Sequence, residues 1–225
     1  MTASGDFLSR LAEEDRAALA ARWAVRQYQR DEMIIAHDES GRDVFFVLEG
    51  RARVTVFSER GRAVAFRDME PGDIFGELAA IDGRARSASV VALEPMRAAR
   101  LSDTAFRQIV NARPTFTWAL LEHLSAQVRR LTDRVYEFST LVVRKRLVRE
   151  LLRLAGAAEQ REGPALIAPV PTHYELATRI STHREAVSRE MSALAKRKLI
   201  TKSGSNLLLR DLDILKALAA SDDER

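Results

Sequence analysis

The sequence predicts an α+β protein in which a β-rich domain is followed by a long helix and then by a second, mostly helical domain. Three observations predict this order. Short apolar segments alternate with glycine turns up to about Leu101, a regular heptad follows Pro114, and two helix-start signals precede a hairpin pattern near the C-terminus. At 225 residues, two modest domains are expected.

Composition and charge restrict the class of protein. There are 46% hydrophobic residues and no cysteine, which fits a reducing compartment and excludes disulfides, thiolate nucleophiles and cysteine-held iron–sulfur clusters. No apolar run approaches the roughly 18 residues of a membrane span, and acidic residues interrupt the place of a signal peptide's apolar region. We therefore expect a cytoplasmic protein without membrane contact.

The whole formal net charge of +4 lies in one segment. Between Thr172 and Lys202 there are seven basic and three acidic residues, whereas the rest of the chain carries 29 of each. A concentration of this kind is typical of a surface that docks on a polyanion.

The first domain is expected to span residues 1–112. An amphipathic helix is predicted from Phe7 to Trp23, and a second short helix from Asp103 to Asn111. Between them, short β-branched or aromatic segments are separated by turns that predict a small β-barrel or roll. The glycines of these segments are Gly41, Gly50, Gly61, Gly72, Gly76 and Gly83.

Residues 113–140 are expected to be the dimerisation segment, formed by a long helix that runs from about Thr115 to beyond Leu141. Its apolar residues, which we call the heptad seam, are spaced alternately by three and four, and this favours a two-stranded coiled coil between subunits of a homodimer. The alternative is a helix packed on its own domain. The seam residues are Leu121, Leu124, Val128, Leu131, Val135, Phe138 and Val142.

The second domain is expected to span residues 141–225. A helix from Leu141 to Gly156 leads through a polar loop to a short strand, and a hairpin is predicted to turn at Ser203 to Asn206. A last helix begins after Asp211, its expected cap.

Two capping boxes predict two helices that start ten residues apart. Thr172 pairs with Glu175, and Thr182 with Glu185. A short turn at Ile180 to Thr182 joins the helices, which is the pattern of a helix-turn-helix whose second helix enters the major groove of DNA. The expected inward residues are Leu176, Ala177, Ile180, Val187, Met191 and Leu194.

The outward residues of the second helix suit base edges. Arginine forks onto guanine and glutamate accepts from cytosine, so Arg184, Glu185 and Arg189, with Ser188 beside them, are candidates for reading double-stranded DNA. Phosphate contact is expected at the helix starts, from Thr172, His173, Thr182 and His183. The alternative is a solvated charged face in which Glu185 only caps its helix.

At these residues the chain resembles the CRP/FNR family of bacterial transcription regulators, and within it the cyclic AMP receptor proteins, over nearly its whole length. Arg184, Glu185 and Arg189 match the family's R-E-x-x-x-R, which implies a winged helix-turn-helix, homodimers on palindromic TGTGA-like sites, and RNA polymerase as a partner. Ser181 departs from the pattern, because the family's turn usually has glycine, which reaches positive φ without strain.

The stretch "FGELAAIDGRARSA" resembles the family's phosphate-binding cassette. The resemblance implies an allosteric cyclic nucleotide, cAMP or cGMP, whose phosphate pairs with Arg86 and whose ribose 2′-hydroxyl donates to Glu77. Each charge-assisted contact is worth about 1.5–3 kcal/mol when shielded from water. The cassette positions are Gly76, Glu77, Leu78, Ala79, Arg86, Ser87 and Ala88.

The base of the nucleotide is met, in the family, by hydroxyl-bearing residues on the long helix. The matching pair is Leu131 and Thr132. Leu131 cannot form a hydrogen bond, so the choice between adenine and guanine stays open.

An enzyme and a metal-binding protein are the other classes of function to consider. His37, Asp38 and Ser40 are adjacent, whereas members of a catalytic triad normally come from separate elements, so no enzyme is expected. Metal ligands with suitable spacing are not found. A regulator that binds DNA constitutively or with a different effector, and a nucleotide sensor acting through protein partners, remain as alternatives.

Overall fold

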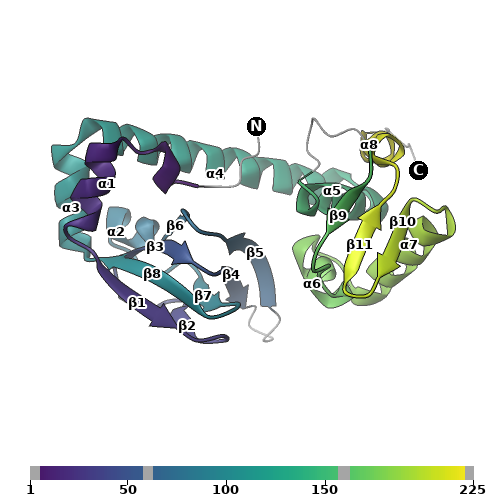
Figure 1. Ribbon diagram of the computed structural model, residues 1–225, viewed down its shortest axis with the longest axis horizontal. Coiled ribbons are helices and arrows are strands. Elements are labelled where there is room, and N and C mark those ends of the chain that lie inside the picture. The colour runs from purple at the N-terminus through teal and green to yellow at the C-terminus, as the bar shows by residue number, and fades with distance from the viewer. Residues whose placement is uncertain (1–5, 58–62, 157–162, 221–225) are drawn as a thin grey trace. The chain divides into compact units, whose positions relative to one another are not determined.

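The computed structural model describes residues 6–57, 63–156 and 163–220. Two compact units make up the chain, one ending at Arg130 and the other beginning at Leu131. The predicted turn at Gly61 and the start of the loop after Gly156 lie outside the described residues. In chain order the elements (Figure 1) are η1 Leu8–Arg10, α1 Glu13–Ala20, β1 Ala24–Tyr28, β2 Met33–Ile35, β3 Val44–Glu49, β4 Ala52–Phe57, β5 Ala63–Met69, β6 Ile74–Phe75, α2 Glu77–Asp82, β7 Ser89–Ala92, β8 Met96–Leu101, α3 Asp103–Ala112, α4 Pro114–Thr140, α5 Val143–Leu154, β9 Ala165–Ile167, α6 His173–Arg179, α7 Arg184–Lys196, β10 Ile200–Ser203, β11 Asn206–Leu209 and α8 Leu212–Ala220.

The first unit is a roll of two four-stranded antiparallel sheets, ordered β1-β8-β3-β6 and β2-β7-β4-β5. Strand β3 is buried on both faces. Val44 and Phe46 pack into the core beneath the helices, while Phe45 and Val47 pack into the core of the roll. Because successive side chains of a strand point to opposite faces, two cores require an unbroken apolar run at this position.

The prediction of one helix from Phe7 to Trp23 is wrong. The segment forms η1 and α1, separated by Leu11 in extended conformation. The interruption has a tertiary cause, since both Phe7 and Leu11 are buried in the core beneath the helices. The Leu8 N–H, which has no acceptor within a first helical turn, donates to the Gly72 carbonyl (3.0 Å). A helix running through Leu11 would replace the extended backbone of this residue and place its buried side chain differently.

Helices α1, α3 and the first turns of α4 lie together beside the roll (Figure 1) and share one core, which includes Phe106 and Phe116. Pro114 is the first residue of α4, where its missing N–H costs nothing. The helix ends at Thr140, earlier than predicted, because Val142 is extended and precedes α5. Leu124 is partly buried against the core, and the other seam residues are 38–65% exposed: Leu121, Val128, Leu131, Val135, Phe138 and Val142.

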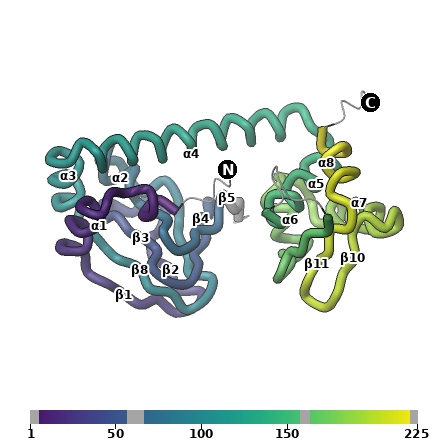
Figure 2. The backbone as a smooth tube through the Cα atoms, turned by 45° about the horizontal axis from the view of Figure 1, so that its top comes forward, coloured from purple at the N-terminus to yellow at the C-terminus, as the bar shows by residue number. Residues whose placement is uncertain are grey.

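The second unit has one core, between helices α5 to α8 and a three-stranded sheet ordered β10-β11-β9. The hairpin is confirmed, with Ser203 opposite Asn206, and Figure 2 shows it running beside α7. The cap is confirmed as well, since Asp211 accepts from the Ile214 N–H (2.9 Å). Within the described ranges, none of the helices is long and apolar enough to cross a membrane.

Candidate functional site

The cassette is built around a glycine that no other residue can replace without strain. Gly76 joins β6 to α2 with a φ of 82°, a left-handed conformation that side chains disfavour. A Cβ atom added there would lie 2.8 Å from Nη1 of Arg86 and 2.9 Å from the Asp43 carbonyl oxygen. The glycine therefore permits both the turn and the close approach of the arginine.

Arg86 is a buried cation held by neutral groups. Its side chain is 5% exposed, and its guanidinium donates to the carbonyls of Gly76 (2.8 Å) and Asp43 (2.7 Å). Among the described residues no carboxylate forms an ion pair with it. Burial lowers the pKa of the Arg86 guanidinium, because desolvation disfavours the charged form, and the carboxylates of Asp43, Glu39 and Glu77 oppose this effect from a distance.

Glu77, the first residue of α2, is also 5% exposed. Burial raises the pKa of its carboxyl group, and a hydrogen bond from Gln127 opposes this effect. The Gln127 Nε2 atom lies 3.3 Å from Glu77 Oε1 and 2.7 Å from His123 Nε2. An amide nitrogen only donates, so the Gln127 NH₂ group donates to both Glu77 Oε1 and His123 Nε2. Because His123 Nε2 accepts this hydrogen bond, it carries no proton.

The contact between α4 and the cassette, through His123 and Gln127, was not predicted from the sequence. His123 is 2% exposed and packs edge-on against Phe7, with 5.4 Å between ring centroids. Burial, with nearby Arg67 and Arg130, lowers the pKa of His123 to about 4. The available signal was the spacing of His123 and Gln127, since residues four apart lie on the same face of a helix.

The remaining cassette residues differ in exposure. Ala79 is buried and Ala88 half-buried, whereas Leu78 and Ser87 are exposed. Leu131 and Thr132 are exposed residues of α4 that belong to the second unit. Their role toward a nucleotide base stays a prediction.

The two predicted helices of the helix-turn-helix are α6 and α7. The first capping box is confirmed: Thr172 accepts from the Glu175 N–H, and the Glu175 side chain accepts from the Thr172 N–H (2.8 Å). The second is wrong, because the cap residue of α7 is His183 and its side chain makes no capping hydrogen bond. The Thr182 N–H instead donates to the Ala177 carbonyl (2.9 Å), so the turn uses the residue that sequence alone assigned to the cap.

Side chains on α6 and α7 follow the predicted division. The inward residues are in the core of the second unit, with Met191 partly buried at its edge. Arg184, Glu185 and Arg189 are exposed. Because Glu185 is not needed as a cap, its carboxylate is available for other contacts.

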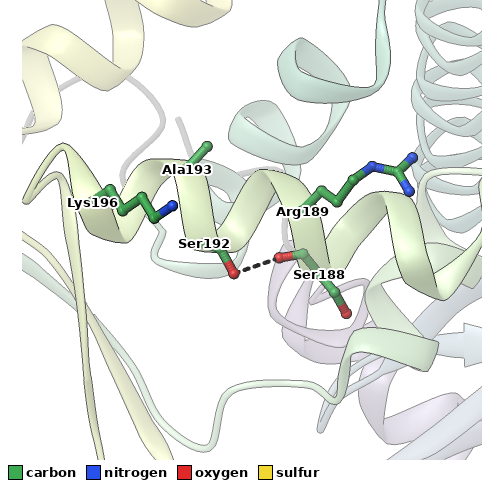
Figure 3. Close-up of a pocket in the computed structure, with 5 residues that line it drawn as sticks. All are labelled: Ser188, Arg189, Ser192, Ala193 and Lys196. Atoms are coloured by element: carbon green, nitrogen blue, oxygen red, sulfur yellow. Dashed lines mark hydrogen bonds between the residues drawn. The ribbon is translucent and has the colours of Figure 1, made fainter.

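A shallow depression on α7 continues this outward face (Figure 3). It is lined by small residues between two basic ones, Arg189 and Lys196. Ser188 lies at the margin of this depression, and its Oγ atom is 2.8 Å from Nδ1 of His173. This hydrogen bond connects the start of α6 with the outward face of α7, and burial lowers the pKa of His173.

The residues weighed as a catalytic constellation lie in a polar turn of the roll. His37 Nδ1 is 3.1 Å from Asp38 Oδ2, and Asp38, with a φ of 62°, is exposed, as is Ser40. The two side chains make a polar contact on the surface, and such exposed contacts contribute little to stability.

Comparisons with known proteins match both units. The family model described as a cyclic nucleotide-binding domain matches residues 25–113, and the one described as a Crp-like helix-turn-helix domain matches residues 145–218. The CRP-like cAMP-activated global transcriptional regulator of Mycobacterium tuberculosis is 27% identical over 200 residues, which cover 88% of this chain and 89% of that protein. The cAMP-activated global transcriptional regulator CRP of Pasteurella multocida is 28% identical over 190 residues, covering 82% and 89%.

Solved structures agree with this assignment of the fold. A CRP/FNR-family transcriptional regulator of Thermus thermophilus superimposes with a TM-score of 0.72 at 27% identity, over 89% of this chain and 100% of that one. Fold and sites together define a DNA-binding transcription regulator with a cyclic nucleotide-binding domain. The chain belongs to the CRP/FNR family. The matched relatives are regulators and not enzymes.

Proposed function

We propose that the protein is a homodimeric regulator whose binding to palindromic, TGTGA-like DNA is controlled by a cyclic nucleotide, with cAMP and then cGMP as candidates. The observation that carries the proposal is the buried Arg86, whose guanidinium is held by two carbonyls. A buried cation with neutral partners is costly, and an anionic phosphate group would relieve that cost.

In the bound state, the phosphate accepts from Arg86, with Ser87 and the N–H group of Ala88 assisting. The ribose 2′-hydroxyl donates to Glu77, in place of or beside the Gln127 amide. Gly76, the residue before α2, and Leu78 and Ala79, in its first turn, form the adjoining backbone. The base then meets α4 at Leu131 and Thr132, where Thr132 offers a hydroxyl group.

DNA binding uses the exposed face of α7. Arg184 and Arg189 read guanines, and Glu185 accepts from a cytosine. Thr172, His173 and His183 lie where the helices begin, near phosphates, while Thr182 is buried in the turn before α7 and would contribute through the position of its neighbours. Two such helices in a dimer predict half-sites about one helical turn, roughly 34 Å, apart. As a transcription regulator it would work in the cytoplasm with RNA polymerase.

The dimer is proposed to form through the heptad seam, whose exposed residues would be buried against a second copy. Leu121→Glu with Val135→Glu should give monomers and abolish binding to a palindromic duplex. Sedimentation at micromolar concentration measures this, and the paired exchange of exposed Glu122 and Asp133 for alanine is the matched control. A monomeric unmodified protein would contradict the dimer.

The central experiment is a titration of a TGTGA palindrome with the full-length protein, alone and with cAMP or cGMP. A shift from 1% to 99% active needs about 5.5 kcal/mol, shared by two ligands per dimer. Operator DNA must then tighten nucleotide binding by the same factor. Equal DNA affinity with and without either nucleotide would overturn the mechanism.

A different effector, or none, is the second candidate. It is favoured by Leu131, an exposed apolar residue at the position expected to recognise the base. If calorimetry detects no binding of cAMP or cGMP at millimolar ligand while the duplex is still bound, this second candidate replaces the first.

A further inference from the structure

The turn between α6 and α7 is built without glycine. Ser181 has a φ of 50°, in the left-handed region that favours glycine. The Thr182 N–H donates to the Ala177 carbonyl and the Ser181 N–H to the Thr178 carbonyl, which is the pattern of a Schellman motif with serine where glycine is usual. Something other than intrinsic preference must therefore stabilise this conformation.

Two guanidinium groups contact the turn from outside. Arg146, on α5, donates through Nη1 to the carbonyls of Ile180 (2.8 Å) and Ser181 (3.3 Å). Arg134, on α4, donates to the carbonyl of Arg179 (2.5 Å). Three consecutive carbonyls at the negative end of α6 are thus each bound by a cation, the arrangement that the helix dipole favours.

The two arginines are held in place by a shared aromatic ring. The Cζ atoms of Arg134 and Arg146 lie 6.0 Å and 5.8 Å from the centroid of Phe138, within the range of cation–π contact. Arg134 also lies 3.4 Å from the buried carboxylate of Glu150. We call Arg134, Phe138 and Arg146 the arginine clamp; all three belong to the second unit.

We propose that the arginine clamp positions the recognition helix. By binding the carbonyls of residues 179–181, it keeps the serine turn left-handed, and the turn sets the angle between α6 and α7. Arg134 and Arg146 act through the turn and not on DNA, so they are positioning residues. This inference deepens the DNA-binding function of the family and does not depend on the nucleotide.

The test uses the full-length protein and a duplex that the unmodified protein selects from a random library, with a scrambled duplex of equal length. Arg146→Ala should weaken the selected duplex about tenfold, the loss expected for a hydrogen bond from a charged group, and the scrambled duplex about twofold. Arg149→Ala is the matched control, because it removes the same charge from α5 but donates to the Ala219 carbonyl.

Ser181→Gly provides the decisive comparison. In the Arg146→Ala background it should restore most of the lost affinity, because glycine adopts a φ of 50° without strain. In the unmodified background it should change affinity little. Failure of this rescue, or equal losses on both duplexes for Arg146→Ala and Arg149→Ala, would overturn the proposal in favour of a simple charge effect.

Amide hydrogen exchange gives a readout that needs no DNA. Arg146→Ala should accelerate exchange at residues 180–187 and leave β9 to β11 unchanged. Arg146→Lys, which keeps the charge on a single donor nitrogen, should lie between. If Arg146→Ala does not fold, Arg134→Gln tests the clamp through its other contact with the turn, at the Arg179 carbonyl. Unchanged exchange in the turn would contradict the clamp even if nucleotide control were established.

Discussion

The cassette and the recognition face of α7 both carry arginine and glutamate, but in opposite surroundings. In the cassette, Glu77 and Arg86 are each 5% exposed and contact neutral groups. On α7, Arg184, Glu185 and Arg189 are exposed to solvent. The same two side-chain types thus form a buried site suited to a small ligand and an exposed surface suited to a polymer such as DNA.

The difference shows how burial decides what a charge can recognise. A buried arginine has already lost its water, so one phosphate group can bind it strongly and with little screening. Exposed arginines keep their water and are screened by salt, so they need many phosphates and several base edges for useful affinity. Salt, substitutions and pH should therefore affect the two sites differently.

Salt should distinguish the two sites most clearly. Raising the salt concentration from about 50 to 200 mM should weaken DNA binding about 10³-fold if some six phosphates are contacted, but nucleotide binding only about twofold, because its charges are shielded. Fluorescence anisotropy with labelled duplex and calorimetry with cAMP, in matched buffers, measure both. Similar salt dependence at the two sites would contradict the claim that burial shields the nucleotide site from salt.

Arg86→Ala should lower nucleotide affinity about 100-fold or more, since two charge-assisted hydrogen bonds are lost. Weak nonspecific DNA binding should persist, because α7 is unchanged. Arg84→Ala is the matched control: this exposed arginine of the same cassette should alter affinity less than about twofold. Calorimetry that finds the two variants equally impaired would contradict a special role for Arg86.

His123 should make the first unit less stable in acid. Its pKa is about 4 in the folded state and about 6.5 when unfolded, so the unfolded state binds more protons between these values. The stabilising contribution is fully present above about pH 6.5 and is lost as pH falls toward 4, by about 3 kcal/mol. Protonation would also prevent Nε2 from accepting the Gln127 hydrogen bond.

Tryptophan fluorescence can measure this loss, because the two tryptophans, Trp23 and Trp118, both precede Leu131. Urea unfolding at about pH 7 and at about pH 4.5 should show a smaller difference for His123→Gln than for the unmodified protein. Parallel curves for the two proteins would exclude His123 as the titrating group.

Arg184→Ala should cost about 1–3 kcal/mol on the preferred duplex and relax the preference at one base pair. Arg107→Ala, which removes an exposed arginine from α3, is the control and should leave the preference unchanged. Binding-site selection with both variants measures the change. An unaltered preference after loss of Arg184 would leave phosphate contact as its only role.

Local patterns predicted most elements of the fold. Strand and hairpin segments, the α4 heptad and the Thr172 capping box depend on periodicity and on hydrogen bonds within a few residues. Two wrong predictions, a continuous helix through Leu11 and a capping box at Thr182, each concern a few residues, but contacts with other parts of the fold explain them. The break at Leu11 places Leu11 and Phe7 in the core beneath the helices, and the Thr182 N–H is used by the turn instead of a cap.

By itself, the sequence determined the order of β-roll, long helix and helix-turn-helix, and the residues that carry charge in the cassette and on α7, because residue type and spacing are local properties. Only the tertiary structure decided which distant groups meet: Gln127 with Glu77, and Arg146 with the carbonyls of the serine turn. These contacts join residues 34 to 50 positions apart. Their existence depends on how complete elements pack, which no spacing within one element specifies.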